Sequence, residues 1–269
     1  NKRYKHVDFS FGPGEIYQLP QRLLSALEGR REEAFQKGED STLYEGLPMM
    51  RSSPFFAYLT VMHGCDNFCS YCIVPMVRGR ERSRDLNQIV AEAQALVDDG
   101  VREIMLLGQN VNSYGKGEDG ADFPKLLREL GKTGIRRLRF MTSNPKDLSD
   151  ELILEMARNP AVCPHLHLPA QSGSDRMLLA MERRYDRETY LNRVRALRSA
   201  MPDIGLTTDL IVAFPGESEA DFDGTMSLVE EVRFDSAFTF IFSPRTGTKA
   251  ARLLGRVPPD IAKDRIARL

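Results

Sequence analysis

The chain has 269 residues, 42% hydrophobic and 28% charged, so it can bury a full core, and one large α/β domain fits this length better than two small ones. Lys and Arg total 37 against 38 for Asp and Glu, so the net charge of −1 neither indicates nor excludes a nucleic-acid partner. The sequence contains no long apolar run and no charged-then-apolar leader, which predicts a cytoplasmic protein without a membrane span. Its four cysteines are too few for a secreted disulfide framework.

The amino-terminal region carries one apolar stretch, Ile16 to Leu27, which predicts a short helix with Pro20 near its start. The following segment, Glu28 to Glu45, is charged and poor in apolar residues, and is predicted to be a connector. The chain opens on Asn1 rather than Met, within sequence that has a structured pattern, so we expect a fragment of a longer protein.

From Phe56 onward, β-type runs alternate with helical patterns. The predicted strands are Phe56–Met62, Glu103–Leu107, Arg137–Thr142, His165–Pro169, Gly205–Ala213 and Ser236–Phe242. The predicted helices are Leu86–Asp98, Pro124–Lys132, Ser149–Arg158, Asp175–Met181, Glu188–Ala200 and Ala220–Val232. Six strand-then-helix units predict parallel strands joined by right-handed crossovers in an incompletely closed barrel. After residue 246 the pattern ends, and Val257-Pro-Pro begins a final basic helix.

Three of the four cysteines lie within eight residues, directly after the first predicted strand: Cys65, Cys69 and Cys72. Their C-x3-C-x2-C spacing can hold three irons of a cubane iron–sulfur cluster and leave the fourth iron open. The alternatives are a zinc site that adds His63 and simple packing of small apolar thiols. Structural zinc ligands usually form two separated pairs, so the crowded spacing favours the cluster. Cys163 lies on another apolar stretch and is predicted to be a core residue.

Polar residues follow or lie in the other five predicted strands. The segments concerned are Gly108–Tyr114, Thr142–Pro145, Ala170–Ser174, Asp209–Glu217 and Ser243–Gly247. Because the carboxyl ends of parallel strands meet at one edge of the sheet, these segments should surround the cysteine loop. Each of these strand ends supplies uncharged hydrogen-bonding groups or a single charge, and such a set suits a polar, zwitterionic organic ligand. For any one loop, an ordinary turn is the alternative.

A second informative string begins six residues after the last cysteine of the trio, where four arginines alternate: Arg78, Arg80, Arg82 and Arg84. In an extended segment their side chains would share one face. Forked guanidinium groups bind phosphates through paired hydrogen bonds, so the string is a candidate contact to an RNA backbone. The alternative is a solvated charged loop with Glu81 and Asp85 as local partners.

At these positions the chain resembles a known family. The cysteine loop, with Tyr71 before its last cysteine, is similar to that of the radical S-adenosylmethionine (SAM) enzymes. Three strings further resemble MiaB-type tRNA methylthiotransferases: Gly64–Pro75, Arg78–Arg84 and Leu106–Tyr114. Other family motif positions, which extend the resemblance over essentially the whole chain, are Gln171–Ser174, Met181–Arg183, Asp209–Glu217 and Ser243–Arg245. The resemblance implies an α/β fold, a partial (β/α)6 radical SAM barrel with parallel strands that is open on one side.

The resemblance also implies a chemistry. A [4Fe-4S] cluster on the cysteine trio binds SAM through its open iron, and a donor such as flavodoxin or ferredoxin supplies the electron that cleaves SAM. The resulting 5'-deoxyadenosyl radical takes hydrogen from C2 of N6-isopentenyladenosine beside the tRNA anticodon, where a methylthio group is added. The implied cofactor contacts are Tyr71, Gln109, Ser143, Gln171, Arg183 and Asp209. The RNA contacts would be Arg78, Arg80, Arg82, Arg84 and Arg245. No catalytic side chain is assigned beyond the cluster.

By the same resemblance, residues 1–50 end an amino-terminal methylthiotransferase domain and connector, residues 51–247 form the radical SAM core, and residues 248–269 lead toward a missing carboxyl-terminal RNA-binding, TRAM-like domain. Family members carry three more cysteines for an auxiliary [4Fe-4S] cluster, and this chain lacks them. Ala213 also replaces a family glycine. We therefore expect a monomeric core that holds one cluster and cleaves SAM without completing methylthiolation.

Other functions stay open at this point. A related radical SAM methylthiotransferase could act on threonylcarbamoyl-adenosine in tRNA or on a ribosomal protein aspartate. A radical SAM enzyme for another polypeptide or small molecule and a zinc-bearing RNA-binding module are the further alternatives. The string Gly108–Ser113 favours the isopentenyladenosine enzyme, with the tRNA anticodon stem-loop as partner.

Overall fold

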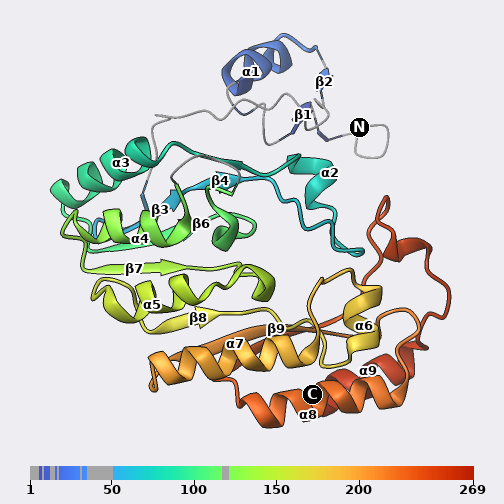
Figure 1. Ribbon diagram of the computed structural model, residues 1–269. Helices are drawn as coiled ribbons and strands as arrows, with labels where there is room; N and C mark the ends of the chain where they lie inside the picture. The colour runs from blue at the N-terminus through green and yellow to red at the C-terminus, as the bar shows by residue number, and fades with distance from the viewer. Residues whose placement is uncertain are drawn as a thin grey trace.

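The computed structural model describes residues 6–7, 9–12, 16, 18–30, 32–34, 51–116 and 121–269. In these ranges, parallel strands lie side by side with helices packed against them (Figure 1). No helix in the described ranges is long and apolar enough to cross a membrane.

The central sheet consists of the six strands that the sequence predicts. They are β3 (Phe56–Thr60), β6 (Glu103–Leu107), β7 (Arg137–Phe140), β8 (His165–His167), β9 (Gly205–Val212) and β10 (Ser236–Ile241). β6 lies between β3 and β7, and β9 lies between β8 and β10, with every pairing parallel. The two halves meet at Leu138 of β7, whose N donates to Ala161 O at 2.7 Å and whose O accepts from Cys163 N at 3.0 Å.

The strands therefore follow one another in chain order, as the ribbon from β3 to β9 shows (Figure 1). Among the described strands, β3 and β10 pair with no further strand of this sheet and so form its two edges. The prediction of a parallel α/β barrel that is open on one side is confirmed. Five of the six strands end one or two residues earlier than predicted. After two of them the chain turns, since Thr142 after β7 has φ 61° and Ala213 after β9 has φ 59°.

Six helices follow the strands, and each lies within one residue of its predicted bounds. They are α3 (Leu86–Asp98), α4 (Phe123–Gly131), α5 (Asp150–Arg158), α6 (Asp175–Ala180), α7 (Arg187–Ala200) and α8 (Glu219–Val232). Each of the six begins after an Asp or Ser whose side chain accepts a hydrogen bond from the backbone of its first turn. The final basic helix is also present, as α9 (Pro259–Arg268).

The core lies between the sheet and these helices. In β9 alternate residues are buried, namely Leu206, Thr208, Leu210 and Val212, while the residues between them are half-buried. Asp209 belongs to the half-buried face, which therefore faces the barrel interior. A strand with this alternation packs one face on helices and leaves the other for a site.

The remaining elements are short. β4 (Met62–His63) pairs antiparallel with β5 (Arg82–Ser83), and α2 (Val74–Arg78) lies between them in the chain. The single-turn helices are η2 (Val111–Ser113), η3 (Pro145–Asp147) and η4 (Ala250–Arg252).

At the amino terminus, the predicted helix is present as α1 (Leu19–Leu27), with Pro20 in its first turn. Within the predicted connector, β2 (Glu32–Ala34) pairs in parallel with β1 (Phe9–Phe11), and the sequence predicted neither strand. Strands of three residues are too short to show an alternating pattern. Residues 35–50 of the predicted connector lie outside the described residues.

Candidate functional site

The cysteine loop starts at a backbone position that only glycine fits. Gly64 follows β4 with φ 74°, and a Cβ added there would lie 1.9 Å from Arg80 O. The next residue, Cys65, donates from its backbone N to Gly79 O at 3.3 Å. The loop is therefore held against the segment Gly79–Arg80, and this contact fixes the position of Cys65.

All three cysteines of the loop are free thiols that line one cavity of about 160 Å³. Cys65 and Cys69 are buried, and Cys72 is half-buried, with its backbone N bonded to Cys69 O at 2.9 Å. Burial raises the pKa of Cys65 to about 11. A positive iron centre would offset this cost, because metal binding holds cysteine as the thiolate.

The zinc alternative requires donors gathered around a single ion. Among the described residues, no group of three or more His, Cys, Asp or Glu side chains is placed in that way. A cubane cluster makes a different demand, since each of three irons takes its own thiolate at a separate corner. The three thiols line one cavity, which is compatible with the cluster.

The cavity also brings together every cofactor contact that the sequence suggested. Its walls include Tyr71, Gln109, Ser143, Gln171, Arg183 and Asp209. They come from the cysteine loop, from the segments after β6, β7 and β8, from the turn after α6 and from β9. Their binding roles stay predictions, but convergence on one cavity is what a ligand site at the carboxyl edge of a parallel sheet requires.

Two polar atoms show that the cavity fits a polar ligand. Ser143 Oγ and Gln109 Oε1 are buried, and neither has a hydrogen-bond partner among the described atoms. Buried polar groups are rarely left without a partner, because this forfeits hydrogen bonds to water. The backbone at Gln171 is held in the left-handed region, φ 65°, by bonds in both directions to β9. A ligand with its own donors and acceptors would satisfy the two orphaned atoms.

Arg183 is the buried cation of the site. Its guanidinium donates to Cys69 Sγ at 3.3 Å, to Pro169 O at 3.3 Å and, through Nε, to Tyr185 Oη at 3.0 Å. The residues on either side, Glu182 and Arg184, both have positive φ values, 57° and 60°. This backbone turns Arg183 inward, where its charge lies against Cys69 and a ligand carboxylate could reach it.

Sequence reasoning missed one ionisable group near the cavity. His167 of β8 is buried, with Nε2 3.4 Å from Asp209 Oδ1 and Nδ1 2.9 Å from Thr207 Oγ1. His167, itself held by Thr207, thus holds the Asp209 carboxylate at the cavity wall. The signal was present, since His165 and His167 are polar residues at alternate positions within a predicted strand.

The arginine string does not form the single extended stripe that we expected. Arg78 ends helix α2, and Arg82 lies in β5 opposite His63. Arg80 is exposed, with its guanidinium carbon 4.9 Å from the Phe68 ring centroid. Their contacts to RNA, and that of the exposed Arg245, stay predictions.

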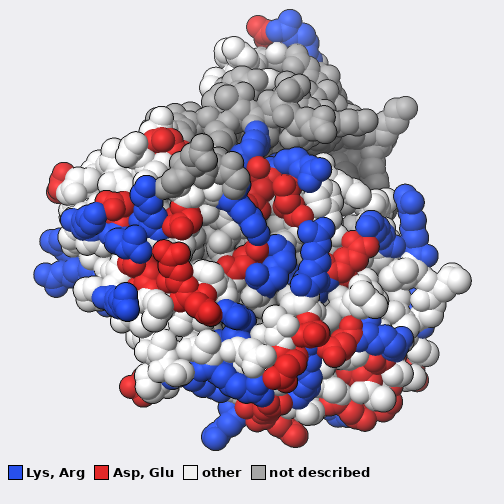
Figure 2. Space-filling model, viewed as in Figure 1, with Lys and Arg blue, Asp and Glu red and all other residues white. Residues whose placement is uncertain are grey.

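Arg84 differs most from the expectation. Only 8% of this residue is exposed; it donates to Thr60 O at 2.6 Å and pairs with Glu92 at 2.7 Å. These contacts fix β3 to α3, so Arg84 is poorly placed to reach a phosphate. On the face shown in Figure 2, Lys and Arg are interspersed with Asp and Glu over the described residues. Recognition of RNA on this face would therefore depend on individual side chains rather than on one broad basic field.

Residues 59–229, which include the whole cysteine loop, the end of β3 and all of β6, β7, β8 and β9, match the family described as the Radical SAM superfamily. The chain belongs to this superfamily. Solved radical SAM structures share the fold: a radical SAM methyltransferase, TsrM from Kitasatospora setae, gives a TM-score of 0.67 at 17% identity over 89% of this chain and 52% of its own. Coproporphyrinogen III oxidase (HemN) from Escherichia coli gives 0.59 at 14% identity over 80% of this chain and 52% of its own.

Curated relatives are much closer in sequence to this radical SAM chain. A tRNA-2-methylthio-N(6)-dimethylallyladenosine synthase from Acetivibrio thermocellus is 50% identical over 100% of the chain, and one of the same name from Alkaliphilus oremlandii is 48% identical. The chain spans 56% and 57% of the length of these two proteins.

Proposed function

We propose that this chain is the catalytic core of a tRNA methylthiotransferase, which adds a methylthio group to C2 of N6-isopentenyladenosine next to the anticodon. The observation that carries the proposal is an identity of 48–50% over the whole chain to enzymes named for that product. The same names favour this nucleoside over threonylcarbamoyl-adenosine and over a protein aspartate.

The cavity supports this function. Membership of the superfamily implies a [4Fe-4S] cluster and SAM, which together supply a radical able to remove hydrogen from an unactivated carbon. Cys65, Cys69 and Cys72 would hold the cluster. Ser143 and Gln109 offer the polar atoms that lack a partner, and Arg183 offers a positive charge beside them. These residues bind and orient the cofactor, while the open side of the barrel admits a nucleoside.

The remaining parts of the proposal concern the longer protein. We place the core at residues 51–247, with the end of an amino-terminal domain before it and a lead toward an RNA-binding domain after it. An auxiliary [4Fe-4S] cluster, an electron donor such as flavodoxin or ferredoxin and the tRNA anticodon stem-loop are its partners, in a monomer located in the cytoplasm. The lengths of the relatives, of which this chain spans little more than half, support further domains.

The decisive experiment is mass spectrometry of tRNA nucleosides from cells that lack the full-length gene. We expect 2-methylthio-N6-isopentenyladenosine to disappear and N6-isopentenyladenosine to accumulate in its place. Restoring the gene should restore the product, whereas a gene with Cys65→Ala should not. Unchanged nucleosides in the deletion strain would refute the proposed function.

A further inference from the structure

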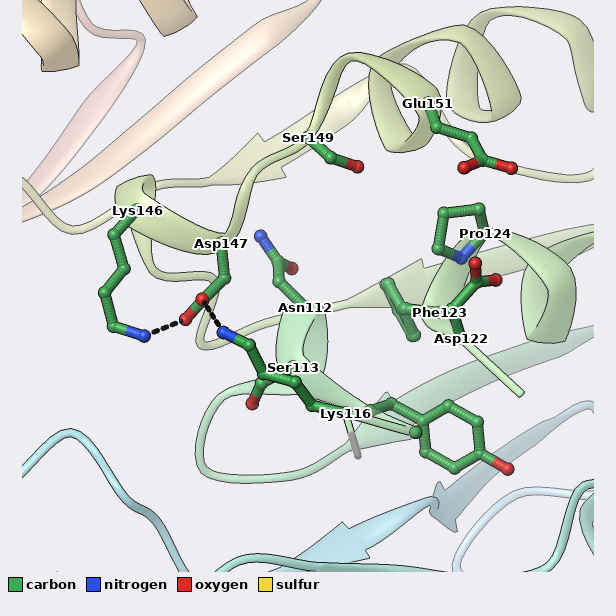
Figure 3. Close-up of a pocket in the computed structure, with 12 residues that line it drawn as sticks. Asn112, Ser113, Lys116, Asp122, Phe123, Pro124, Lys146, Asp147, Ser149 and Glu151 are labelled. Carbon is green, nitrogen blue, oxygen red and sulfur yellow. Dashed lines mark hydrogen bonds and ion pairs between the residues drawn. The ribbon is translucent and has the colours of Figure 1, made fainter. Parts of the chain in front are cut away.

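Two further cavities lie beside the candidate site, at the same carboxyl edge of the sheet. The first, of about 320 Å³, is lined by Asn67, which also lines the cofactor cavity, and by Lys116, Lys146 and Arg184. The second, of about 300 Å³, shares both lysines with the first and extends to Asn112 (Figure 3). The shared residues make the three cavities neighbours along one path that begins at the cysteine loop. Volumes near 300 Å³ are in the range of small-ligand sites.

The two lysines are held by a single buried carboxylate. Asp147 of η3 accepts from Lys116 Nζ at 2.8 Å and from Lys146 Nζ at 2.6 Å, as Figure 3 shows. Its side chain is only 5% exposed and also accepts from Asn110 Nδ2 at 2.7 Å. The Asp147 carboxylate therefore positions both ammonium groups. Together the three side chains carry one net positive charge at the boundary of the two cavities.

Arg184 adds a third cation to the first cavity. Its backbone lies in the left-handed region, φ 60°, which side-chain-bearing residues rarely adopt. This geometry sends Arg183 toward Cys69 and its neighbour Arg184 toward the adjoining cavity. Arg184 is exposed, and its guanidinium has no hydrogen bond or ion pair with any residue that the structure describes. Strained backbone that presents an unpaired cation is typical of a binding position.

Two carboxylates, Asp66 and Glu81, share the first cavity with these cations. Asp66 lies 3.4 Å from Arg80 Nη1 and accepts from the backbone N of Glu81 at 3.3 Å. Glu81 is the second carboxylate, and burial raises its pKa. Three cations therefore face two carboxylates, one of which is paired with Arg80, so the cavity offers ammonium and guanidinium donors that suit a phosphate group.

Asn112 gives the second cavity a different character. Both polar atoms of its amide, Oδ1 and Nδ2, are buried without a hydrogen-bond partner among the described atoms. In Figure 3 the amide points into the space between Asp147 and Ser149. A primary amide offers one acceptor beside one donor, the arrangement with which Asn reads the edge of a nucleobase.

We propose that these two cavities bind the nucleotide adjacent to the target adenosine in the RNA. Its phosphate lies against Lys116, Lys146 and Arg184, and its base edge faces Asn112. This inference rests on the proposed function, because it requires RNA as the substrate. The site would make the enzyme sensitive to the base beside the one that it modifies.

The first experiment tests the proposed phosphate contact. It measures binding of a short RNA stem-loop, with N6-isopentenyladenosine in its loop, by fluorescence anisotropy at several salt concentrations. We expect Arg184→Ala to weaken binding about five- to tenfold at low salt and to reduce the slope of log K against log salt by about 0.7. Arg136→Ala is the matched control, since Arg136 is also exposed and lies just before β7, at the opposite edge of the sheet. It should bind as the wild type does.

The second experiment tests the proposed base contact with Asn112, using stem-loops that differ only in the nucleotides beside the target adenosine. We expect the wild-type chain to prefer one base about tenfold at one of these positions, and Asn112→Ala to lose that preference. A wild-type salt slope in Arg184→Ala, or a base preference that survives Asn112→Ala, would overturn the inference while leaving the proposed function intact. A wild-type chain that binds none of the stem-loops would overturn both.

Discussion

Ser143 illustrates how a single residue can indicate function by what it lacks. Its buried Oγ has no partner in the described protein, so Ser143→Ala removes a polar atom that costs free energy in the absence of ligand. We expect the free energy of unfolding of the ligand-free chain to stay constant or rise by up to about 1 kcal/mol. SAM affinity should fall about tenfold, because the ligand loses a hydrogen bond. Urea unfolding and equilibrium dialysis measure the two quantities.

Ser172 provides the control for this prediction. It is also fully buried, but its Oγ accepts from Ser174 N at 3.2 Å and lies 3.2 Å from Thr225 Oγ1. Ser172→Ala should therefore lower the free energy of unfolding by about 1 kcal/mol and leave SAM affinity unchanged. If Ser143→Ala behaves in the same way as Ser172→Ala, the orphaned hydroxyl of Ser143 has no role in binding.

At the scale of single residues, the sequence predicted which side chains line one cavity, but it did not predict the ion pairs of Arg84 and His167. The six expected cofactor contacts share one cavity because the carboxyl ends of parallel strands must converge. The inward position of Arg84 could not be read from the chain, since it depends on Glu92, in the second turn of the following helix α3. His167 was missed for a related reason: a polar residue in a strand gains meaning only once the facing strand is known.

Between elements, Asp221 joins two helices. It belongs to the capping box of α8 and accepts from Ser218 N at 2.8 Å, while it also accepts from Ser174 Oγ, the cap of α6, at 2.6 Å. Burial raises the pKa of Asp221, but hydrogen bonds from Arg176, Ser174 and Ser218 outweigh burial and hold the pKa well below its ordinary value. The charged form is therefore the one that stabilises the joint.

The pH dependence follows from this direction. A folded pKa below the unfolded value of about 3.9 gives stability that is complete above that pH and is lost as pH falls toward the folded value. We expect Asp221→Asn to lower the free energy of unfolding by about 2 kcal/mol at neutral pH and by progressively less below about pH 4. Urea unfolding across this pH range tests the prediction, and a difference that does not vary with pH would contradict it.

The loop that carries the cysteines depends on a second local feature. Gly64 and Gly100 both have positive φ values, 74° and 92°, but only at Gly64 would a Cβ strike the neighbouring backbone. Gly64→Ala should displace Cys65 and lower the iron bound after reconstitution to less than about half of the wild-type content. Gly100→Ala should cost only about 1 kcal/mol of stability, with iron unchanged. Iron assay and urea unfolding of both variants distinguish a clash of the new Cβ with Arg80, expected only at Gly64, from the strain of a positive φ, expected at both positions.

The elements themselves show where sequence patterns are sufficient. The six helices were predicted within one residue because each combines an apolar period with an Asp or Ser cap. Helix α2 was missed since its five residues, Val74 to Arg78, are too few to show a period. β1 and β2 were missed for the same reason, and their pairing is a contact across more than twenty residues that no local pattern reveals.

For the whole molecule, the positions of the cysteines limit what the chain can hold. The cluster loop lies at the carboxyl edge of the sheet, whereas Cys163 is buried just before β8, at the opposite edge. The two cannot contribute to one centre. We therefore expect reconstitution to give about four irons per chain, as for one cubane cluster. Cys163→Ala should keep this content and Cys69→Ala should lose most of it. Iron and sulfide assays decide, and about eight irons per chain would contradict the prediction.

The same limit bears on the reaction. With SAM and a chemical reductant, the reconstituted chain should form 5'-deoxyadenosine, because the predicted cluster ligands and the orphaned polar atoms of the cavity that they line all belong to this core. An added RNA stem-loop should yield no methylthiolated nucleoside, since Cys163 is the one thiol outside the cysteine loop and it is buried just before β8, at the opposite edge of the sheet. Chromatography with mass spectrometry detects both products. Methylthiolated nucleoside formed by this chain alone would show that the sulfur reaches the site without a second cluster.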